Sequence, residues 1–223
     1  GNTSKGASIS IDNYQNSSDN YEVKVVIKNN ELDRTIQVSR SEQVLISDNI
    51  LAMANNYSDG INEYYVANSE IKNNQLTGYS LNNSTGIYLD RSNSTVSDNV
   101  ISKFNTGISV STDFTNPTFD SLLRNTVVFN GSKGIYVSNY GRVLAQYNNI
   151  YDNYDTASYN ESSSQYFQTY DFYADGEAYD EIDARFNYWG ETVKSQMATG
   201  ANPKNINRIY DKKDDAKKSF VNY

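Results

Sequence analysis

The feature that most constrains this chain is a unit of about 25 residues that recurs five times. An Asn returns at intervals of 25, 25, 26 and 23 residues, always with small or aliphatic residues three positions before it and two positions after it. The Asn positions are Asn49, Asn74, Asn99, Asn125 and Asn148, flanked by Ile46, Ile71, Val96, Leu122 and Ala145 on one side and Leu51, Leu76, Ile101, Val127 and Ile150 on the other. A fixed period of this size with short apolar stretches indicates stacked, repeated units.

A second apolar segment follows in four of the units, where Gly precedes Ile at Gly60-Ile61, Gly86-Ile87, Gly107-Ile108 and Gly134-Ile135. Successive residues of a strand point to opposite faces, so we expect Ile87 and Leu89 inside and Tyr88 outside. The Gly suits either a turn with positive φ or a close approach of two backbones. Each unit is therefore predicted to contain three short strands.

Three parallel strands per turn predict an all-β fold, a right-handed parallel β-helix, because crossover connections favour the right hand. We expect three-strand coils of about 25 residues, and roughly seven of them. Residues 1–205 are expected to form this solenoid, with degenerate N-terminal coils and a loop excursion near 152–183. Residues 206–223 are expected to be a C-terminal capping segment.

The five recurrent Asn residues, called the Asn column below, are predicted to be structural. Asn tolerates the left-handed conformation that a sharp bend between strands requires. Stacked at ~4.8 Å, the amide side chains can also hydrogen-bond in a ladder. We therefore interpret the column as scaffold, with no role in ligand binding.

Composition excludes several classes of function. The chain has no Cys and no His, which removes thiolate metal sites and triads that depend on His. A net charge of −8 argues against a nucleic-acid partner, since that binding depends on Lys and Arg. No apolar run approaches the ~20 residues of a membrane span, so we expect no membrane insertion.

The repeats, followed by Asn187-Tyr188-Trp189-Gly190 and then by Ile209-Tyr210-Asp211, resemble the right-handed parallel β-helix repeat proteins with pectate-lyase-like folds. The closing signature is similar to that of adhesin-like surface proteins of bacteria and archaea. The resemblance implies an extracellular or cell-surface location and a domain cut from a larger protein. It leaves activity open, because polysaccharide lyases, glycoside hydrolases, phage tailspikes and non-catalytic adhesins share this fold.

Candidate catalytic residues are few. Asp98 and Arg124 each precede an Asn of the column and should stack with opposite charge, and Lys103 and Lys133 lie in the turns beyond them. A uronate lyase needs a basic residue of this kind near a carboxylate, so Asp98, Lys103 and Arg124 are lyase candidates, with a surface ion pair as the alternative. Two further acids, Asp90 and Asp113, are candidates for glycoside hydrolysis, with solvated turn residues as the alternative.

An acidic segment near residue 175 could supply oxygen ligands to calcium, the one cofactor we consider. Asp171, Asp175 and Glu177 are the candidates, although their spacing does not match an EF-hand loop. A solvated acidic loop is the alternative.

Aromatic residues are the stronger indication of function, since the chain has 20 Tyr, many of them after Tyr147. Exposed rings can stack on sugar faces or anchor a partner, and otherwise they cover a sheet face. We expect Phe186 and Trp189 to plug the last coil. The ligand-binding candidates are Tyr88, Tyr136, Tyr166, Tyr170 and Tyr173.

The favoured function is therefore a non-catalytic extracellular binding or adhesion module that recognises a glycan or another host or cell-surface ligand. Two alternatives stay open at this point. One is a polysaccharide-active enzyme of the lyase type, or a fragment of one, and the other is a structural stalk or phage fibre segment. The sequence names neither the sugar nor the oligomeric state.

Overall fold

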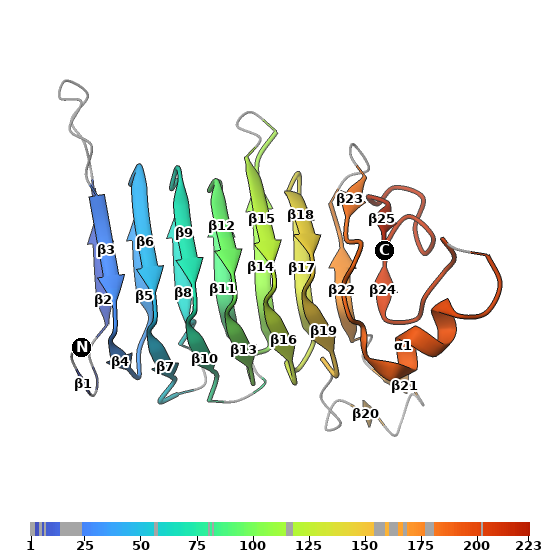
Figure 1. Cartoon of the computed structure of the whole chain (residues 1–223), viewed down its shortest axis with the longest axis horizontal. Helices are drawn as coiled ribbons and strands as arrows, with labels where there is room; N and C mark the ends of the chain where they lie inside the picture. Colours follow the sequence, from blue (N-terminus) through green and yellow to red (C-terminus); the bar gives the residue numbers. More distant parts are fainter. Residues whose placement is uncertain are drawn as a thin grey trace.

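The computed structural model describes all residues except 1–2, 5, 7, 14–23, 56–57, 80, 82, 115–117, 154–158, 161–164, 167–168, 177–180 and 202. The chain winds through three parallel sheets in turn, so that strands of successive coils lie side by side along the long axis (Figure 1). Sheet A contains β1 (Thr3–Ser4), β4 (Glu31–Leu32), β7 (Ile50–Ala52), β10 (Gln75–Thr77), β13 (Val100–Ser102), β16 (Thr126–Val128) and β19 (Asn149–Tyr151).

Sheet B contains β2 (Ile9–Asp12), β5 (Ile36–Ser39), β8 (Ile61–Tyr64), β11 (Thr85–Asp90), β14 (Thr106–Thr112), β17 (Lys133–Asn139), β22 (Tyr170–Ala174) and β24 (Ile209–Tyr210). Sheet C contains β3 (Lys24–Lys28), β6 (Gln43–Ser47), β9 (Ser69–Lys72), β12 (Ser94–Ser97), β15 (Phe119–Leu123), β18 (Arg142–Gln146), β23 (Ile182–Asp183) and β25 (Val221–Asn222). The predicted parallel solenoid is confirmed. Its sheets of seven, eight and eight strands make the stack slightly longer than the coil count predicted, because the tail adds β24 and β25.

The interior is filled by aligned columns of aliphatic side chains. In sheet A the register pairs each of Leu51, Leu76, Ile101, Val127 and Ile150 with its equivalent one coil further on, and all five are fully buried. Burying one aliphatic side chain contributes roughly 1.5–3 kcal/mol, so one such column contributes on the order of 10 kcal/mol. The inward positions predicted from alternation in the Gly-Ile segments, such as Ile87 and Leu89, are buried as well.

The Asn column forms the predicted ladder. The backbone N–H and the Nδ2 group of Asn74 both donate to Oδ1 of Asn99, at 2.9 Å each, and Asn99 donates in the same way to Asn125. The ladder reaches beyond the predicted column, to Asn30 at one end and Asn187 at the other. Each buried amide is thus satisfied by its neighbours, which is what keeps these polar side chains inside an apolar coil.

The bend itself was assigned to the wrong residue. None of the five column Asn residues has positive φ; the residue before each of them does, namely Asp48, Asn73, Asp98, Arg124 and Tyr147. Asn29 and Phe186, which precede the ladder ends Asn30 and Asn187, have positive φ as well. The Asn keeps its side chain directed at the ladder while its predecessor turns the chain. The Gly residues of the four Gly-Ile pairs do not have positive φ either. Glycine is required there by the close approach of neighbouring coils, since a Cβ on Gly86 would lie 2.6 Å from the carbonyl oxygen of Gly107.

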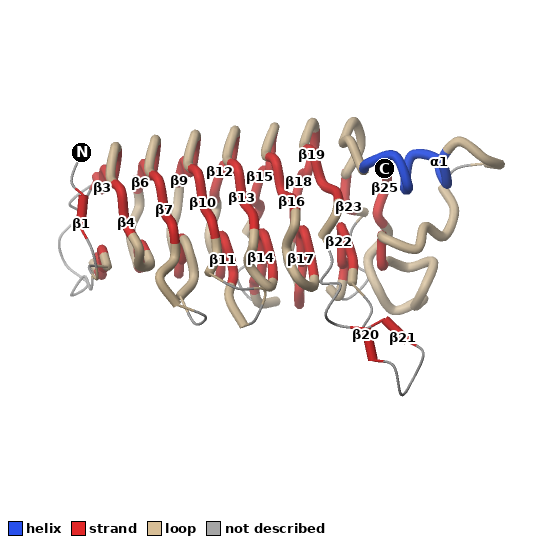
Figure 2. The backbone as a smooth tube through the Cα atoms, turned by 90° about the horizontal axis from the view of Figure 1, so that it is seen from below, coloured by secondary structure: helices blue, strands red, loops and turns tan. Residues whose placement is uncertain are grey.

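A helix lies at the C-terminal end of the stack. The only α-helix of the described residues, α1 (Gly190–Met197), comes before the tail, and Figure 2 shows it at the end of the stack that carries the C-terminus. Trp189 is 4% exposed and packs edge-on against Phe172, with ring centroids 6.3 Å apart, as a plug should. Phe186 is 63% exposed, so its predicted burial was wrong: it occupies the turning corner position and stacks on Tyr147 in solvent.

The segment near 152–183, where a loop excursion was expected, contains four strands in its described part. β20 (Tyr159–Asn160) and β21 (Gln165–Tyr166) pair only with each other, antiparallel, outside the stack. β22 and β23 belong to the coils, because residues such as Phe172, Ala174 and Ile182 bury apolar side chains in the core. The interruption expected at Asn116-Pro117 lies outside the described residues.

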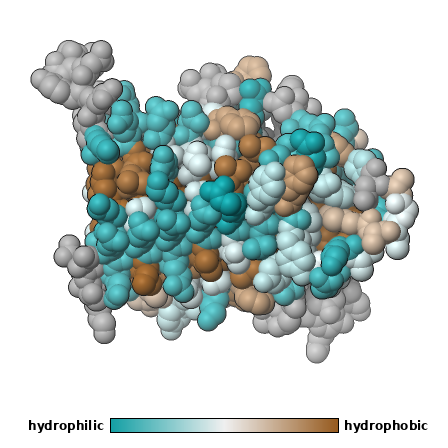
Figure 3. Space-filling model, in the orientation of Figure 1, coloured by the Kyte–Doolittle hydropathy of each residue, from teal (hydrophilic) through white to brown (hydrophobic). Residues whose placement is uncertain are grey.

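The outer surface is largely polar. Figure 3 shows a mostly hydrophilic face along the middle of the stack, with apolar atoms exposed toward the end that carries β3. In β3, Val26 is 45% exposed. Among the described residues no helix is both long and apolar enough to cross a membrane.

Candidate functional site

Four tyrosines gather on the outer face of sheet B at its C-terminal end, and we call them the tyrosine cluster: Tyr136, Tyr170, Tyr173 and Tyr210. The register places Tyr136, Tyr173 and Tyr210 on three successive strands. The rings of Tyr173 and Tyr210 stack in parallel with centroids 4.4 Å apart, and Tyr136 meets Tyr173 at 5.6 Å. Tyr170 touches both Tyr173 and Tyr210, at 5.0 and 5.4 Å.

Charged groups border these rings. The ammonium of Lys133 lies 5.0 and 5.2 Å from the ring centres of Tyr136 and Tyr173, close enough for cation–π attraction. The Tyr136 hydroxyl donates to the carboxylate of Asp175 at 3.1 Å, and the ammonium of Lys218 lies 2.5 Å from that carboxylate. The cluster therefore combines flat apolar rings with both hydrogen-bond donors and hydrogen-bond acceptors.

Burial shifts the titration of this cluster. It raises the pKa of Tyr136 to about 12, helped by the neighbouring charge of Asp175, and raises that of Tyr170 to about 12, helped by Asp214. The same burial lowers the pKa of Lys133, which Asp175 partly opposes. Both tyrosines stay protonated near neutral pH, and Tyr136 donates its one hydroxyl hydrogen to Asp175.

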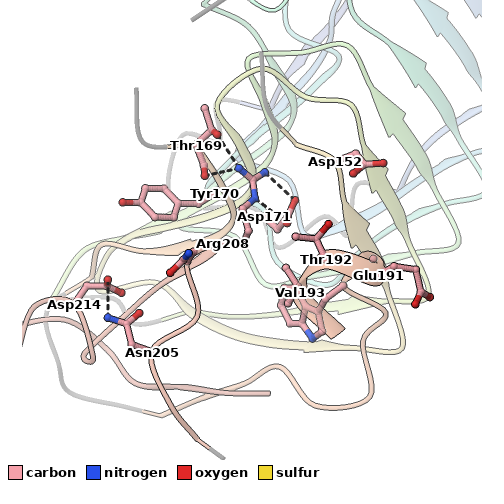
Figure 4. Close-up of a pocket in the computed structure, with 13 residues that line it drawn as sticks. Asp152, Thr169, Tyr170, Asp171, Glu191, Thr192, Val193, Asn205, Arg208 and Asp214 are labelled. Atoms are coloured by element: carbon pink, nitrogen blue, oxygen red, sulfur yellow. Dashed lines mark hydrogen bonds and ion pairs between the residues drawn. The ribbon is translucent and has the colours of Figure 1, made fainter. Parts of the chain in front are cut away.

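A cavity of about 700 Å³ opens beside the cluster, between sheet B, α1 and the tail. Tyr170, which is 6% exposed, is the member of the cluster that also lines the cavity, so the two adjoin there. Figure 4 shows Asp214 and Asn205 on one side of the cavity and Asp152 and Glu191 on the other. The lining residues are Asp152, Thr169, Tyr170, Asp171, Trp189, Gly190, Glu191, Thr192, Val193, Asn205, Asn207, Arg208 and Asp214. Clefts of this size that are lined by both apolar and polar groups are typical ligand sites.

Within this cavity, Arg208 and Asp171 have a structural role. Asp171 is almost fully buried and ends a second ladder, in which Asn130 donates to Asn153 and Asn153 donates to Asp171. Arg208 donates to Asp171 at 3.2 Å and also to the carbonyl oxygens of Thr169 and Asn153. The guanidinium ties the tail to the last coils and neutralises the buried carboxylate.

The structure brings together three of the five tyrosines expected to bind ligand: Tyr136, Tyr170 and Tyr173. Tyr88 lies elsewhere, two strands from Tyr136 with Ser109 between them, and its ring contacts Tyr64 at 5.5 Å. The side chain of Tyr166 lies outside the described residues.

Tyr210 was not expected, because it sits in the tail beyond the interrupted repeats. Its sequence signal was nevertheless present. Ile209-Tyr210 repeats the apolar-then-Tyr order of Phe172-Tyr173 and Ile135-Tyr136, with which it aligns.

The candidate lyase residues do not form a cleft together. Asp98 and Arg124 make the predicted stacked pair, with two hydrogen bonds of 2.8 Å on an exposed corner, and the pKa of Asp98 is lowered chiefly by its hydrogen bond from Arg124. Lys103 lies at the far end of β13 from Asp98, roughly 10 Å along the strand. The glycosidase candidates Asp90 and Asp113 both contact Arg91, at 2.5 and 3.5 Å.

The calcium candidates are occupied by protein groups where they are described. Asp171 accepts from Asn153 and Arg208, Asp175 accepts from Tyr136 and Lys218, and Glu177 lies outside the described residues. No group of three or more His, Cys, Asp or Glu side chains suited to a metal occurs in the part of the chain that is described. Calcium binding stays a prediction.

A pair of buried acids inside the coil was not foreseen. Glu63, fully buried, accepts from the hydroxyls of Ser69 at 2.5 Å and Ser94 at 2.7 Å. Asp120, also fully buried, accepts from the backbone N–H of Ser94 at 2.8 Å, and its second oxygen has no hydrogen-bond partner. Burial is the main reason that the pKa of Glu63 rises to about 7, and it raises that of Asp120 well above its usual range.

Comparison with known proteins agrees with this architecture. A family model described as "Right handed beta helix region" matches residues 9–172, which include most of the stack and the start of β22. The match supports the predicted hand of the winding. No curated protein and no solved structure gives a significant match.

Proposed function

The chain belongs to the right-handed β-helix family, and from that premise we propose that it is a non-catalytic, extracellular carbohydrate-binding module of a larger surface protein. The fold is consistent with surface proteins and with proteins that act on polysaccharides, so the choice between a binding module and an enzyme depends on the candidate site. The adhesin-like closing signature agrees with a surface location.

The observation that carries the proposal is that the tyrosine cluster adjoins the cavity, with Tyr170 common to both. Aromatic rings offer flat apolar surface to the faces of sugar rings. Asn205, Asn207 and Thr192 line the adjoining cavity and can both donate to and accept from sugar hydroxyls. A surface of this kind suits an oligosaccharide that runs from the cluster into the cavity.

The test is glycan binding by variants of the cluster. Tyr210→Ala and Tyr173→Ala are expected to weaken the affinity for a bound glycan roughly 30-fold each, as loss of an aromatic anchor worth about 2 kcal/mol does. Tyr88→Ala is the matched control, since Tyr88 is also an outward tyrosine of sheet B but lies outside the cluster. Affinities would be measured by titration calorimetry on glycans selected from an array. Equal losses for Tyr88→Ala and Tyr210→Ala would contradict the proposal.

Lyase chemistry is a second candidate, and one observation favours it. Lys133 is half-buried against Tyr136 and Tyr173, and burial lowers its pKa, which brings it closer to the range of a base. An assay for unsaturated oligosaccharide products decides between the two functions. Product that disappears in a folded Lys133→Met variant would establish the enzyme, and its absence with retained glycan binding supports the module.

A further inference from the structure

Tyr173 and Tyr210 form the closest and most nearly parallel pair of tyrosine rings among the described residues. Their ring centres lie 4.4 Å apart and their planes differ by 6°. The other tyrosine pairs in contact in that part of the chain are separated by 5.0 to 5.6 Å and cross at angles of 56° to 71°. These crossed pairs are Tyr64–Tyr88, Tyr136–Tyr173, Tyr151–Tyr188, Tyr170–Tyr173 and Tyr170–Tyr210.

Parallel strands bring the two stacked rings together. β22 and β24 lie side by side, with Tyr173 directly opposite Tyr210 (Figure 1). Because equivalent side chains leave parallel strands in the same direction, the two rings have the same orientation and their hydroxyl ends lie on the same side. In agreement, the pKa of Tyr173 is raised first by burial, then by the charge of Asp175 and by the neighbouring Tyr210. The ring carbons ortho to the two hydroxyls are therefore neighbours as well.

The two rings need to move little to become bonded. In a biaryl, the ring centres are separated by one carbon–carbon bond and two ring radii, which is close to the 4.4 Å already present. A quarter turn of each ring about its Cβ–Cγ bond, a torsion with broad minima, points the ortho carbons at each other. Both side chains are only partly buried on the outer face of sheet B, so a small oxidant can reach them.

We propose that Tyr173 and Tyr210 are the site of an intramolecular dityrosine cross-link, formed when hydrogen peroxide activated by a haem peroxidase oxidises the protein. This inference goes beyond the proposed function and does not depend on it. The bond ties the tail to the last coil, where β24 pairs with β22 over only two residues. The chain has no Cys, so no disulfide can serve this purpose.

The reaction is a two-electron oxidation. Each phenol gives up one electron and its hydroxyl proton, and one peroxide molecule takes up both electrons and both protons as its O–O bond breaks to give two molecules of water. The two phenoxyl radicals couple at their ortho carbons, which forms one carbon–carbon bond. Each of these carbons then passes its hydrogen to its own phenolic oxygen as a proton, which restores the aromatic rings and the hydroxyls. The protein loses two hydrogen atoms overall.

The cross-link adds a covalent tie to contacts that can otherwise open. Ion pairs between Arg208 and Asp171 and between Lys218 and Asp175 hold the tail on the coils. A bond between two chain segments restricts the unfolded chain and so favours the folded one. Oxidation is therefore expected to fix β24 against β22.

The experiment treats the full chain with hydrogen peroxide and peroxidase at low protein concentration, which disfavours coupling between molecules. The monomer is then digested, and joined peptides are identified by mass spectrometry. We expect one dominant product, in which the peptides of Tyr173 and Tyr210 are joined and together lack two hydrogen atoms. Tyr210→Phe keeps the ring but has no hydroxyl to oxidise, so this product should be lost. The matched control Tyr64→Phe, which alters a crossed pair, should leave its yield unchanged.

The opposite results would overturn the inference. A dominant link at a crossed pair, such as Tyr64–Tyr88, would show that stacking does not select the site. The same conclusion follows from products that form only between molecules, from no dityrosine at all, or from an equal yield of the Tyr173–Tyr210 link in protein unfolded with urea before oxidation. None of these measurements involves a glycan, so the proposed function stands or fails separately.

Discussion

Glu63→Gln is expected to change the way the stability of the protein depends on pH. The carboxyl of Glu63 is fully buried in the coil, with Ser69 and Ser94 as partners, and its pKa rises from 4.5 to about 7. In the unfolded chain the same group is exposed and keeps its ordinary pKa. The folded protein therefore holds a proton on Glu63 that the unfolded chain has already released.

The sign and size follow from linkage. Between pH 4.5 and 7 the folded state binds more protons than the unfolded state, so the free energy of unfolding falls as pH rises. A difference of about 2.5 pKa units at ~1.4 kcal/mol each amounts to about 3 kcal/mol. This stability is present below pH 4.5 and lost by the time pH has passed 7. The pKa of Asp120 is raised in the same direction, so it adds to the trend.

Glutamine has the shape of a protonated glutamate and carries no charge at any pH. Its amide can accept a hydrogen bond from one serine hydroxyl and donate one to the other. We therefore expect the stability of Glu63→Gln relative to the natural chain to increase by about 3 kcal/mol between pH 4 and pH 8.

Urea unfolding at several values of pH measures this difference. Glu70→Gln is the control, because Glu70 is exposed on sheet C and its variant should follow the natural chain within ~0.5 kcal/mol at every pH. Parallel curves for the natural chain and Glu63→Gln across pH 4–8 would refute the argument from burial.

Three other changes test the scaffold in urea unfolding. Arg208→Met should lower the free energy of unfolding by about 3–5 kcal/mol, because it leaves the buried Asp171 without its charge partner. Adding Asp171→Asn should restore part of that loss. An unchanged free energy of unfolding in Arg208→Met would contradict this role. Asn99→Ala should cost about 1–3 kcal/mol by leaving the ladder donors of Asn74 unpaired, whereas the exposed Asn149→Ala should change stability by less than ~0.5 kcal/mol. Gly107→Ala should cost about 1–3 kcal/mol, since its Cβ would lie 2.6 Å from the Gly134 oxygen, and an unchanged midpoint would mean that the coils can separate there.

The period of the sequence predicted the scaffold well because successive coils stack in register, which places equivalent residues of each repeat directly above one another. Ile101 lies over Leu76 because both occur two residues after an Asn, and no other information is needed to place them. The corner conformation was assigned one residue too late, since Asn favours both the left-handed region and an amide ladder and the sequence does not separate the two.

The candidate site was only partly predictable, because it forms where the period fails. The second ladder ends in Asp171, which lies only 18 residues after Asn153 and is an Asp where the repeat predicts an Asn. Neither the spacing nor the residue type therefore identifies it from the sequence. Tyr210 joins the cluster from the tail, across an interruption that hides its register. Glu63 could have been found, since its register aligns it with the buried Leu89 in a column where an acid breaks the pattern.

The ladder has a consequence for the length of the molecule. Because each Asn bonds to its neighbour in the same way, excising residues 50–74 would join Asn49 to Gln75 and let Asn49 take the place of Asn74 beside Asn99. Such a cut shortens the rod by one step of ~4.8 Å and leaves every residue from Lys133 onward in its surroundings. The length of the solenoid and the candidate ligand site therefore depend on separate segments of the chain. The number of coils sets the length, and the last coils and the tail form the site.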